Sequence, residues 1–220
     1  MMKIKRIVFN PFQENTYLVD AGDGKCLIVD PGAYDSQEKE MLLGELRAKE
    51  PVAVLMTHGH PDHIAAAGLL QREFGVKVYM HPADAEVPAH IAGPLAAHLD
   101  LDFETTPVSD GQSLTLAGLE CEVIHTPGHS PGGVCYLFKN ENVLFSGDTL
   151  FRGTIGRSDL YKGEYDDLIR SVMDKIMGLP GCTEVLPGHA GTTTIAEERT
   201  ENPFLQPFNE PEEDYAVNSL

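Results

Sequence analysis

Four short apolar segments of the sequence each end directly in a turn that carries histidine or aspartate. Residues 52–56 run into "THGHPDH", 119–124 into "HTPGHSPGG", 143–147 into Asp148, and 183–187 into "GH" at His189. Apolar runs of this length, bounded by glycine and proline, are typical of buried strands. Loops at strand ends are held by a rigid sheet, so we expect these turns to meet at one edge of an α/β fold.

The densest of these turns is "HGHPDH". In an extended stretch residues two apart share a face, so His58, His60 and Asp62 can point the same way. Gly59 lets the backbone approach closely, and a helix starting at the following proline can swing His63 back toward the others. The alternative is a chance cluster on a solvated loop.

Ligand-type side chains in the four turns number seven: His58, His60, Asp62, His63, His129, Asp148 and His189. A catalytic zinc ion takes three protein ligands and a water molecule, so seven are too many for one ion. Two ions that share one carboxylate use all seven. The sequence therefore predicts a two-metal centre.

Strand and helix signals alternate along the chain. Residues 16–20 and 25–32 predict a hairpin with "AGDG" at its turn, and residues 36–50 predict an amphipathic helix stopped by Pro51. A second helix is expected over 62–75, capped by Asp62 and closed by Gly75. This mixture of hairpins and strand–helix units predicts an α/β sandwich of two mixed sheets flanked by helices.

The later segments continue the pattern. We expect strands over 119–126, 132–138, 142–148 and 183–188, and helices over 165–178 and near 195–202. Residues 82–100 carry three prolines and predict an irregular, partly helical insertion. A single domain is expected over residues 1–208, followed by a loose acidic tail over 209–220.

Composition narrows the partners. The formal net charge of −18, from 16 basic and 34 acidic residues, disfavours nucleic acid and anionic membranes. The chain begins as a strand, without a signal-like or membrane-spanning segment, which predicts a cytoplasmic protein. The four cysteines form no C-x-x-C pair, and three of them stand in apolar runs typical of buried, reduced thiols.

Together these motifs resemble the metallo-β-lactamase superfamily of hydrolases. Its H-x-H-x-D-H signature stands here as "HGHPDH", and "TPGHSPGG", "FSGDTLF" and "LPGHAG" match the later ligand motifs in order. The resemblance covers roughly residues 7–205 and implies an αββα four-layer sandwich.

The resemblance also implies a role for each ligand-type residue. His58, His60 and His129 would hold the first metal; Asp62, His63 and His189 would hold the second; and Asp148 would bridge them. Asp62 and Asp148 would be the catalytic carboxylates beside a metal-bound hydroxide. Asp30, in "IVDPG", resembles the strand-end aspartate that orients a ligand histidine, with a plain turn residue as the alternative. Two zinc ions are expected, with iron or manganese as alternatives.

The stretch "GDTLFRGTIGRSDLYKGEYDDL" is similar to the short-form glyoxalase II group of hydroxyacylglutathione hydrolases. This implies a metal-dependent thioesterase that cleaves S-2-hydroxyacylglutathione, such as S-D-lactoylglutathione. Arg152 and Arg157 would bind the anionic thiol carrier, unless nearby acids such as Asp159 pair with them. Ala190 and Gly191 stand where that group carries a tyrosine, which puts glutathione specificity in doubt.

Alternative functions remain open within the same fold. They are a mononuclear-iron persulfide dioxygenase and a lactonase or β-lactamase-like hydrolase; a metal-stabilised binding module is disfavoured because all seven ligand-type residues are present. The remaining histidines, His81, His90, His98 and His125, are predicted to be structural or exposed. The sequence leaves the acyl group and the oligomeric state undetermined.

Overall fold

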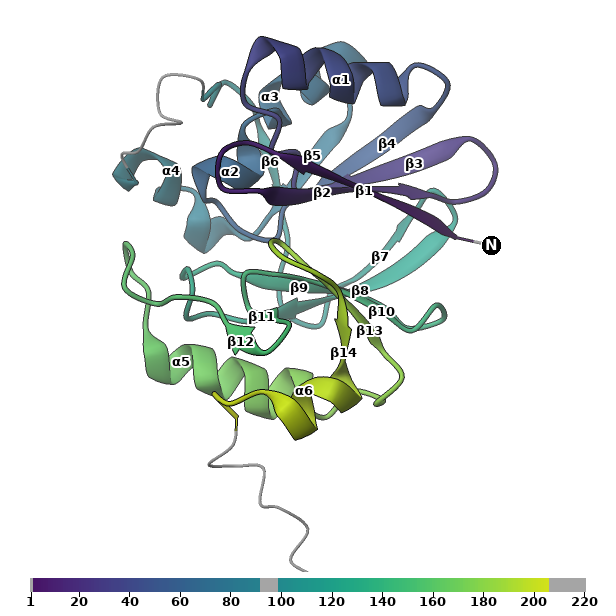
Figure 1. Cartoon of the computed structure of the whole chain (residues 1–220). Helices are drawn as coiled ribbons and strands as arrows, with labels where there is room; N and C mark the ends of the chain where they lie inside the picture. Colours follow the sequence, from purple (N-terminus) through teal and green to yellow (C-terminus); the bar gives the residue numbers. More distant parts are fainter. Residues whose placement is uncertain (1, 92–98, 206–220) are drawn as a thin grey trace, which may run out of the picture.

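The computed structural model describes residues 2–91 and 99–205, which form two sheets packed face to face with helices on both outer sides (Figure 1). The first sheet has the strand order β1-β2-β3-β4-β5-β6. Its strands are β1 (Lys3–Phe9), β2 (Glu14–Asp20), β3 (Lys25–Val29), β4 (Glu50–Leu55), β5 (Lys77–Met80) and β6 (Thr105–Pro107). β1, β2 and β3 pair antiparallel, whereas β3 to β6 pair parallel.

The second sheet has the strand order β14-β13-β10-β9-β8-β7. Its strands are β7 (Ser113–Leu116), β8 (Leu119–His125), β9 (Val134–Phe138), β10 (Val143–Gly147), β13 (Glu184–Pro187) and β14 (Thr193–Thr194). β10 and β13 are parallel and the other pairs are antiparallel. A small hairpin of β11 (Leu150–Phe151) and β12 (Thr154–Ile155) follows β10.

Helices cover the outer face of each sheet (Figure 1). α1 (Ser36–Leu46) and α3 (Ala67–Phe74) lie over the first sheet, and α5 (Tyr165–Arg170) and α6 (Ile195–Glu201) lie over the second. α5 continues into a π-helical segment, Ser171–Ile176. The predicted α/β sandwich of two mixed sheets flanked by helices is therefore confirmed.

Alternation along the central strands explains this layering. In β2, Tyr17 and Val19 face the core between the sheets, whereas Leu18 faces the helices, where it joins Leu42 and Leu46 of α1. Successive side chains of a strand point to opposite faces. Since both faces of β2 are buried, its run of apolar residues is a property of a central strand in a four-layer fold.

The helix expected over 62–75 is wrong in its start and its continuity. The structure has α2 (Pro61–Ile64), a break, and then α3; Asp62 lies inside α2, and His60 precedes its first turn without a side-chain cap. The backbone N–H of Ala66 donates to the carbonyl of Pro31 (2.9 Å), a tertiary bond that draws the chain out of the helix. The Asp62 carboxylate is therefore free to face the adjacent turns.

Other helix boundaries differ by a few residues. α1 starts after Asp35, whose side chain accepts the Glu38 N–H, and ends four residues before Glu50, where β4 already begins. The predicted closure of the second helix at Gly75 agrees with its left-handed φ of 65°. A capping box of Thr194 and Glu197 opens α6.

The predicted insertion contains two short turns, Pro82–Asp84 and α4 (Val87–His90). Residues 92–98 of that insertion, and all residues after Leu205, including the expected tail, lie outside the described residues. Within the described ranges, no helix has the length and apolar content needed to cross a bilayer.

Candidate metal centre

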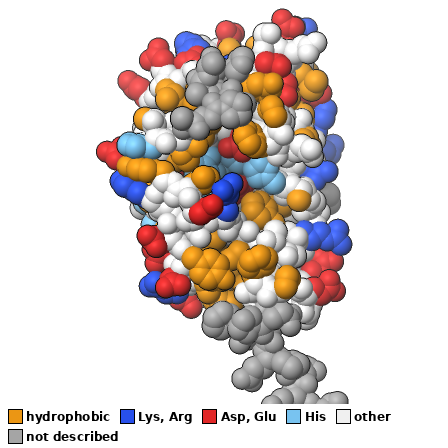
Figure 2. Space-filling model, turned by 60° about the vertical axis from the view of Figure 1, so that its left-hand side comes forward, with side chains coloured by type: hydrophobic (Ala, Val, Ile, Leu, Met, Phe, Trp, Pro, Cys, Tyr) orange, Lys and Arg blue, Asp and Glu red, His pale blue; other side chains and the backbone are white. Residues whose placement is uncertain are grey.

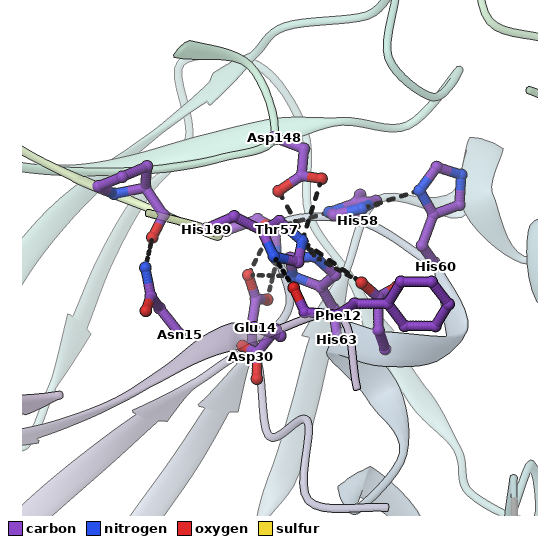
Figure 3. A network of polar contacts seen from close by, with 12 residues as sticks. Phe12, Glu14, Asn15, Asp30, Thr57, His58, His60, His63, Asp148 and His189 are labelled. Atoms are coloured by element: carbon purple, nitrogen blue, oxygen red, sulfur yellow. Dashed lines mark hydrogen bonds and ion pairs between the residues drawn. The ribbon is translucent and has the colours of Figure 1, made fainter. Parts of the chain in front are cut away.

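The turns that carry the seven ligand-type residues lie at the edge of both sheets where α2 lies (Figure 1). Figure 3 shows five of these side chains together: His58, His60, His63, Asp148 and His189. β4 leads into His58 and His60, and α2 carries Asp62 and His63. From the second sheet, β8 leads to the turn with His129, β10 to Asp148, and β13 to His189. Histidine side chains line a hollow on this face of the molecule, bordered by hydrophobic groups (Figure 2).

The first cluster consists of His58, His60 and His129. The Nδ1 atom of His60 lies 3.0 Å from Nε2 of His58 and 2.8 Å from Nε2 of His129. All three side chains are buried, and their nitrogens are close enough together to hold one metal ion.

The second cluster consists of Asp62, His63 and His189. The Nε2 atoms of the two histidines are 3.3 Å apart, and Oδ2 of Asp62 lies 3.3 Å from Nε2 of His189. These three groups also can hold one metal ion. A further combination, Asp30 with His58 and His63, meets the same distance limit, but both Asp30 oxygens already accept hydrogen bonds.

Asp148 lies between the two clusters. Its Oδ1 is 3.4 Å from Nε2 of His63, and its Oδ2 is 3.4 Å from Nε2 of His129 and 3.5 Å from Nε2 of His189. Oδ1 is buried without a hydrogen-bond partner in the described part of the chain. Such an orphaned carboxylate oxygen among imidazole nitrogens fits a bound cation.

Electrostatics favour neutral imidazoles in the first cluster. Burial holds the pKa of His58 well below its usual range and, with the neighbouring His129, lowers the pKa of His60 to about 2. A neutral imidazole offers a lone pair to a metal ion, whereas an imidazolium does not. The donor set of this cluster therefore fits a metal centre.

The second cluster is rich in negative charge. Burial alone would raise the pKa of Asp62, but His63 and His189 outweigh burial and lower it. Conversely, burial would lower the pKa of His63, but the carboxylates of Asp148, Asp62 and Asp30 raise it. Carboxylates that attract positive charge this strongly suit a divalent cation.

His129 and His189 each direct Nε2 toward the site, and a backbone carbonyl lies beside the Nδ1 atom of each. Nδ1 of His129 lies 2.7 Å from the carbonyl of Arg157, and Nδ1 of His189 lies 3.0 Å from the carbonyl of Phe12. A carbonyl can only accept, so both Nδ1 atoms carry a proton, and in the neutral imidazole the lone pair is then on the Nε2 atom that faces the site. Metal-binding histidines are usually held in this way.

Asp30 performs the same task for His63. Its Oδ2 accepts a hydrogen bond from His63 Nδ1 (3.0 Å) and from the Thr57 hydroxyl (2.6 Å), and its Oδ1 accepts the Thr57 N–H (2.7 Å). Asp30 adopts a left-handed φ of 47°, which turns its carboxylate from the end of β3 toward α2. Asp30 thus contacts a ligand-type histidine (Figure 3), and its role in orienting a metal ligand stays a prediction.

In the described residues, neither of the two arginines expected near substrate has a side-chain hydrogen bond or ion pair to a ligand-type residue. The Arg157 guanidinium donates to both carboxylate oxygens of Asp159 (2.6 and 2.8 Å) at the exposed surface. Arg152 is exposed in the turn between β11 and β12. The pairing of Arg157 with a nearby acid was the alternative that the sequence left open.

Two buried carboxylates were not found from the sequence. Glu14, at the start of β2, is fully buried beside Thr16, and burial raises its pKa well above the usual value. Asp84, just after β5, is also fully buried and bonds to two ligand-bearing turns. β5 ends at the same sheet edge as β4. The expectation that functional side chains follow strand ends therefore also applies to Asp84.

The remaining described histidines make ring contacts outside the clusters. His81 stacks on His125 with 4.1 Å between ring centroids, and His90 stacks on Tyr161 at 4.0 Å. His98 lies outside the described residues.

The chain is similar to known proteins that are described as metallo-hydrolases. Residues 9–189 match the family model described as the metallo-beta-lactamase superfamily. Among curated relatives, the probable metallo-hydrolase YqgX of Bacillus subtilis is 34% identical over 217 residues, covering 94% of this chain and 100% of that protein. The hydroxyacylglutathione hydrolase GloC of Haemophilus influenzae is 33% identical over 210 residues, covering 93% of this chain and 98% of that protein.

Solved structures share the fold over nearly the whole chain. The BLEG-1 B3 metallo-beta-lactamase is 35% identical with a TM-score of 0.81, covering 92% of this chain and 99% of its own. TTHA1623 in a di-iron-bound form is 36% identical with a TM-score of 0.77, covering 91% and 100%. ETHE1 from Myxococcus xanthus is 25% identical with a TM-score of 0.72, covering 96% and 92%.

Proposed function

The chain belongs to the metallo-beta-lactamase superfamily and is a metal-dependent hydrolase, and on that premise we propose that it is a thioesterase. The substrate is an S-2-hydroxyacylglutathione such as S-D-lactoylglutathione, which water cleaves to glutathione and a 2-hydroxy acid. The observation that carries the proposal is the convergence of two His/Asp clusters on one intervening carboxylate, Asp148.

Each cluster has a proposed occupant. His58, His60 and His129 hold one divalent ion, Asp62, His63 and His189 hold the other, and Asp148 reaches both. When bound, two such ions polarise the substrate carbonyl and supply a nucleophile from water near neutral pH. Zinc is the proposed metal; the di-iron form of TTHA1623 makes iron the first alternative.

The protein's own groups account for the rest of the reaction. His63 and His189 outweigh burial and lower the pKa of Asp62, so this carboxylate would help, with Asp148, to hold two cations beside the reacting centre. A thiol leaving group has a pKa near ~8.5 and departs as thiolate without a strong general acid. A site with histidine and aspartate but no additional proton donor is therefore sufficient for a thioester.

The glutathione part of the proposal rests on the similarity to GloC and on Arg157. Arg157 reaches the site edge through its own carbonyl, which holds His129. Its exposed guanidinium can exchange Asp159 for a substrate carboxylate, since an exposed ion pair contributes little stability.

β-Lactam hydrolysis is the second candidate, because the BLEG-1 lactamase matches this chain as closely as any thioesterase relative described above. Persulfide oxidation is the third candidate and rests on the sequence resemblance alone. Hydrolysis of a β-lactam and of a thioester would both use the two clusters, so only the substrate separates them.

The test is thiol release from S-D-lactoylglutathione by purified protein, before and after chelation, with a chromogenic cephalosporin and glutathione persulfide assayed in parallel. Chelator-sensitive thiol release that exceeds cephalosporin turnover supports the proposal. Faster cephalosporin turnover, or oxygen uptake with persulfide and no thiol release, overturns it. Elemental analysis of the same preparation identifies the metal.

A further inference from the structure

We propose that Asp84 is a positioning residue that ties together the two loops forming the first metal cluster. One loop carries His58 and His60 and follows β4 of the first sheet; the other carries His129 and follows β8 of the second. This inference rests on the proposed metal centre, but it concerns how the chain holds the ligands rather than which residues they are.

The contacts of Asp84 reach both loops at once. Its Oδ2 accepts the backbone N–H of Gly59 and the hydroxyl of Ser130, each at 2.8 Å. Its Oδ1 accepts the backbone N–H of Gly132 at 2.5 Å. Gly59 stands between His58 and His60, and Ser130 directly follows His129, so every bond ends within three residues of a proposed ligand.

The two loops approach Asp84 so closely that neither of two glycines could carry a side chain. A Cβ atom on Gly59 would lie 2.9 Å from the Asp84 carbonyl oxygen, and one on Gly132 would lie 2.7 Å from the Asp84 backbone nitrogen and from Oδ1. Distances under 3.0 Å to backbone atoms are not tolerated in real structures. Both glycines therefore serve a close approach to Asp84.

The cost of burying Asp84 is met by these bonds alone. Its side chain is fully buried, and in residues 2–91 and 99–205 no lysine or arginine forms an ion pair with it. A buried carboxylate without a cationic partner is expensive unless its hydrogen bonds are well made. Hydrogen bonds to a charged acceptor are stronger than those between neutral groups. They therefore suit a residue that fixes the position of two loops relative to each other.

The geometry of the first cluster depends on how the loop with His58 and His60 lies relative to the loop with His129. Nδ1 of His60 faces Nε2 of His58 in its own loop at 3.0 Å, and Nε2 of His129 across the sheets at 2.8 Å. Direct backbone pairing supports the loops elsewhere, as in the Val134 N–H to Thr57 carbonyl bond (2.8 Å). Asp84 adds a connection through Gly59 and Ser130, each of which directly neighbours a proposed ligand in the sequence.

The substitution Asp84→Asn preserves size and removes one acceptor. Whichever way the amide turns, its NH2 group faces Gly59 N–H and Ser130, or Gly132 N–H, so two donors confront each other. We expect the apoprotein to fold with a lower melting temperature. Zinc affinity of the first cluster should fall about 10- to 100-fold, the usual effect of losing a group that orients a metal ligand.

Glu198→Gln is a matched control, because Glu198 is an equally buried carboxylate with three donors. It accepts bonds from Gly153 N–H (2.9 Å), the Thr193 hydroxyl (2.6 Å) and the Asn202 amide (2.7 Å). None of these donors is within two residues of a proposed ligand. We expect this variant to lose stability comparably while keeping wild-type zinc affinity.

The experiment is titration of each apoprotein with zinc against a chromophoric chelator, together with thermal unfolding of the apoproteins. Cobalt(II) absorption spectra identify the affected cluster, with His129→Ala as the reference for loss of the first. Selective loss at the first cluster in Asp84→Asn, absent from Glu198→Gln, supports the inference. Equal affinity in wild type and Asp84→Asn, or equal loss at both clusters, overturns it.

A second variant keeps the test decisive if Asp84→Asn does not fold. Ser130→Ala removes one of the three bonds and should weaken the same cluster to a smaller extent; unchanged zinc affinity there would also overturn the inference. Failure of the wild-type protein to bind two zinc ions is a different result, because it would refute the metal centre itself.

Discussion

The substitution Asp30→Asn should disable the second cluster by changing the proton position on His63. In the native site, Asp30 receives three hydrogen bonds, from Thr57 N–H, the Thr57 hydroxyl and His63 Nδ1–H. Asparagine has a single carbonyl oxygen. If that oxygen keeps the buried Thr57 N–H, the amide NH2 group faces His63 Nδ1 and turns it into an acceptor.

The proton then moves to Nε2 of His63, the atom that faces Asp148 and His189. A protonated Nε2 cannot bind a metal ion. Outer groups of this kind typically contribute 10- to 100-fold in metal affinity, which is about 1.4 to 2.7 kcal/mol. The backbone should tolerate the change, because asparagine accepts the left-handed φ of 47° at least as well as aspartate.

The assay is zinc competition on the apoprotein, in which the weaker of two binding steps is followed. Asp35→Asn serves as control, since Asp35 only caps α1 and asparagine caps equally well. A second-step affinity within about twofold of wild type in Asp30→Asn, on the scale where tenfold is about 1.4 kcal/mol, would refute the tautomer argument.

Four further predictions concern the same molecule. Asp148→Ala should weaken both metal sites and abolish hydrolysis, because the two oxygens of this carboxylate lie 3.4 Å from Nε2 of His63 and of His129, one histidine from each cluster; unchanged turnover would exclude the bridging position. Arg157→Ala should raise KM for S-D-lactoylglutathione about tenfold with little change in kcat, whereas Arg170→Ala, which removes a comparable exposed ion pair, should change neither. Chelation should lower the melting temperature by about 10 °C relative to protein in zinc at ~1,000 times the dissociation constant, a stabilisation of about 4 kcal/mol; identical melting curves would mean that the clusters do not bind zinc. At pH 8 only the exposed Cys182 should react with a thiol reagent, because burial raises the pKa of Cys26 and Cys135 to about 11 and of Cys121 to about 12; a second fast-reacting thiol would contradict this.

Periodicity and strand-end chemistry were sufficient to predict the layers and to locate the seven side chains. The alternation of β2 side chains between the two cores, and the turns after β4, β8, β10 and β13, are local consequences of the sequence. Hydrogen bonds between segments distant in the chain could not be predicted from the sequence. The break between α2 and α3 depends on the Pro31 carbonyl, which lies 35 residues away from Ala66 in the chain.

Side-chain partners were equally hidden. Nothing in "HPADAEV" distinguishes a buried Asp84 from a solvated turn residue, because its three donors come from segments far along the chain. Arg157 has an acid two residues away, and the structure selects that local partner. The assignment of the seven side chains as ligands stays a prediction that metal titration decides.

The division of the site between the two sheets has a consequence for synthesis of the chain. His58, His60, Asp62 and His63 leave the ribosome with the first sheet, but the first cluster gains its third nitrogen only with His129. The second cluster is completed by His189, which follows β13 near the end of the described chain. The two donor sets are therefore completed one after the other during synthesis, and a nascent chain that ends after His189 but before β14 already carries both.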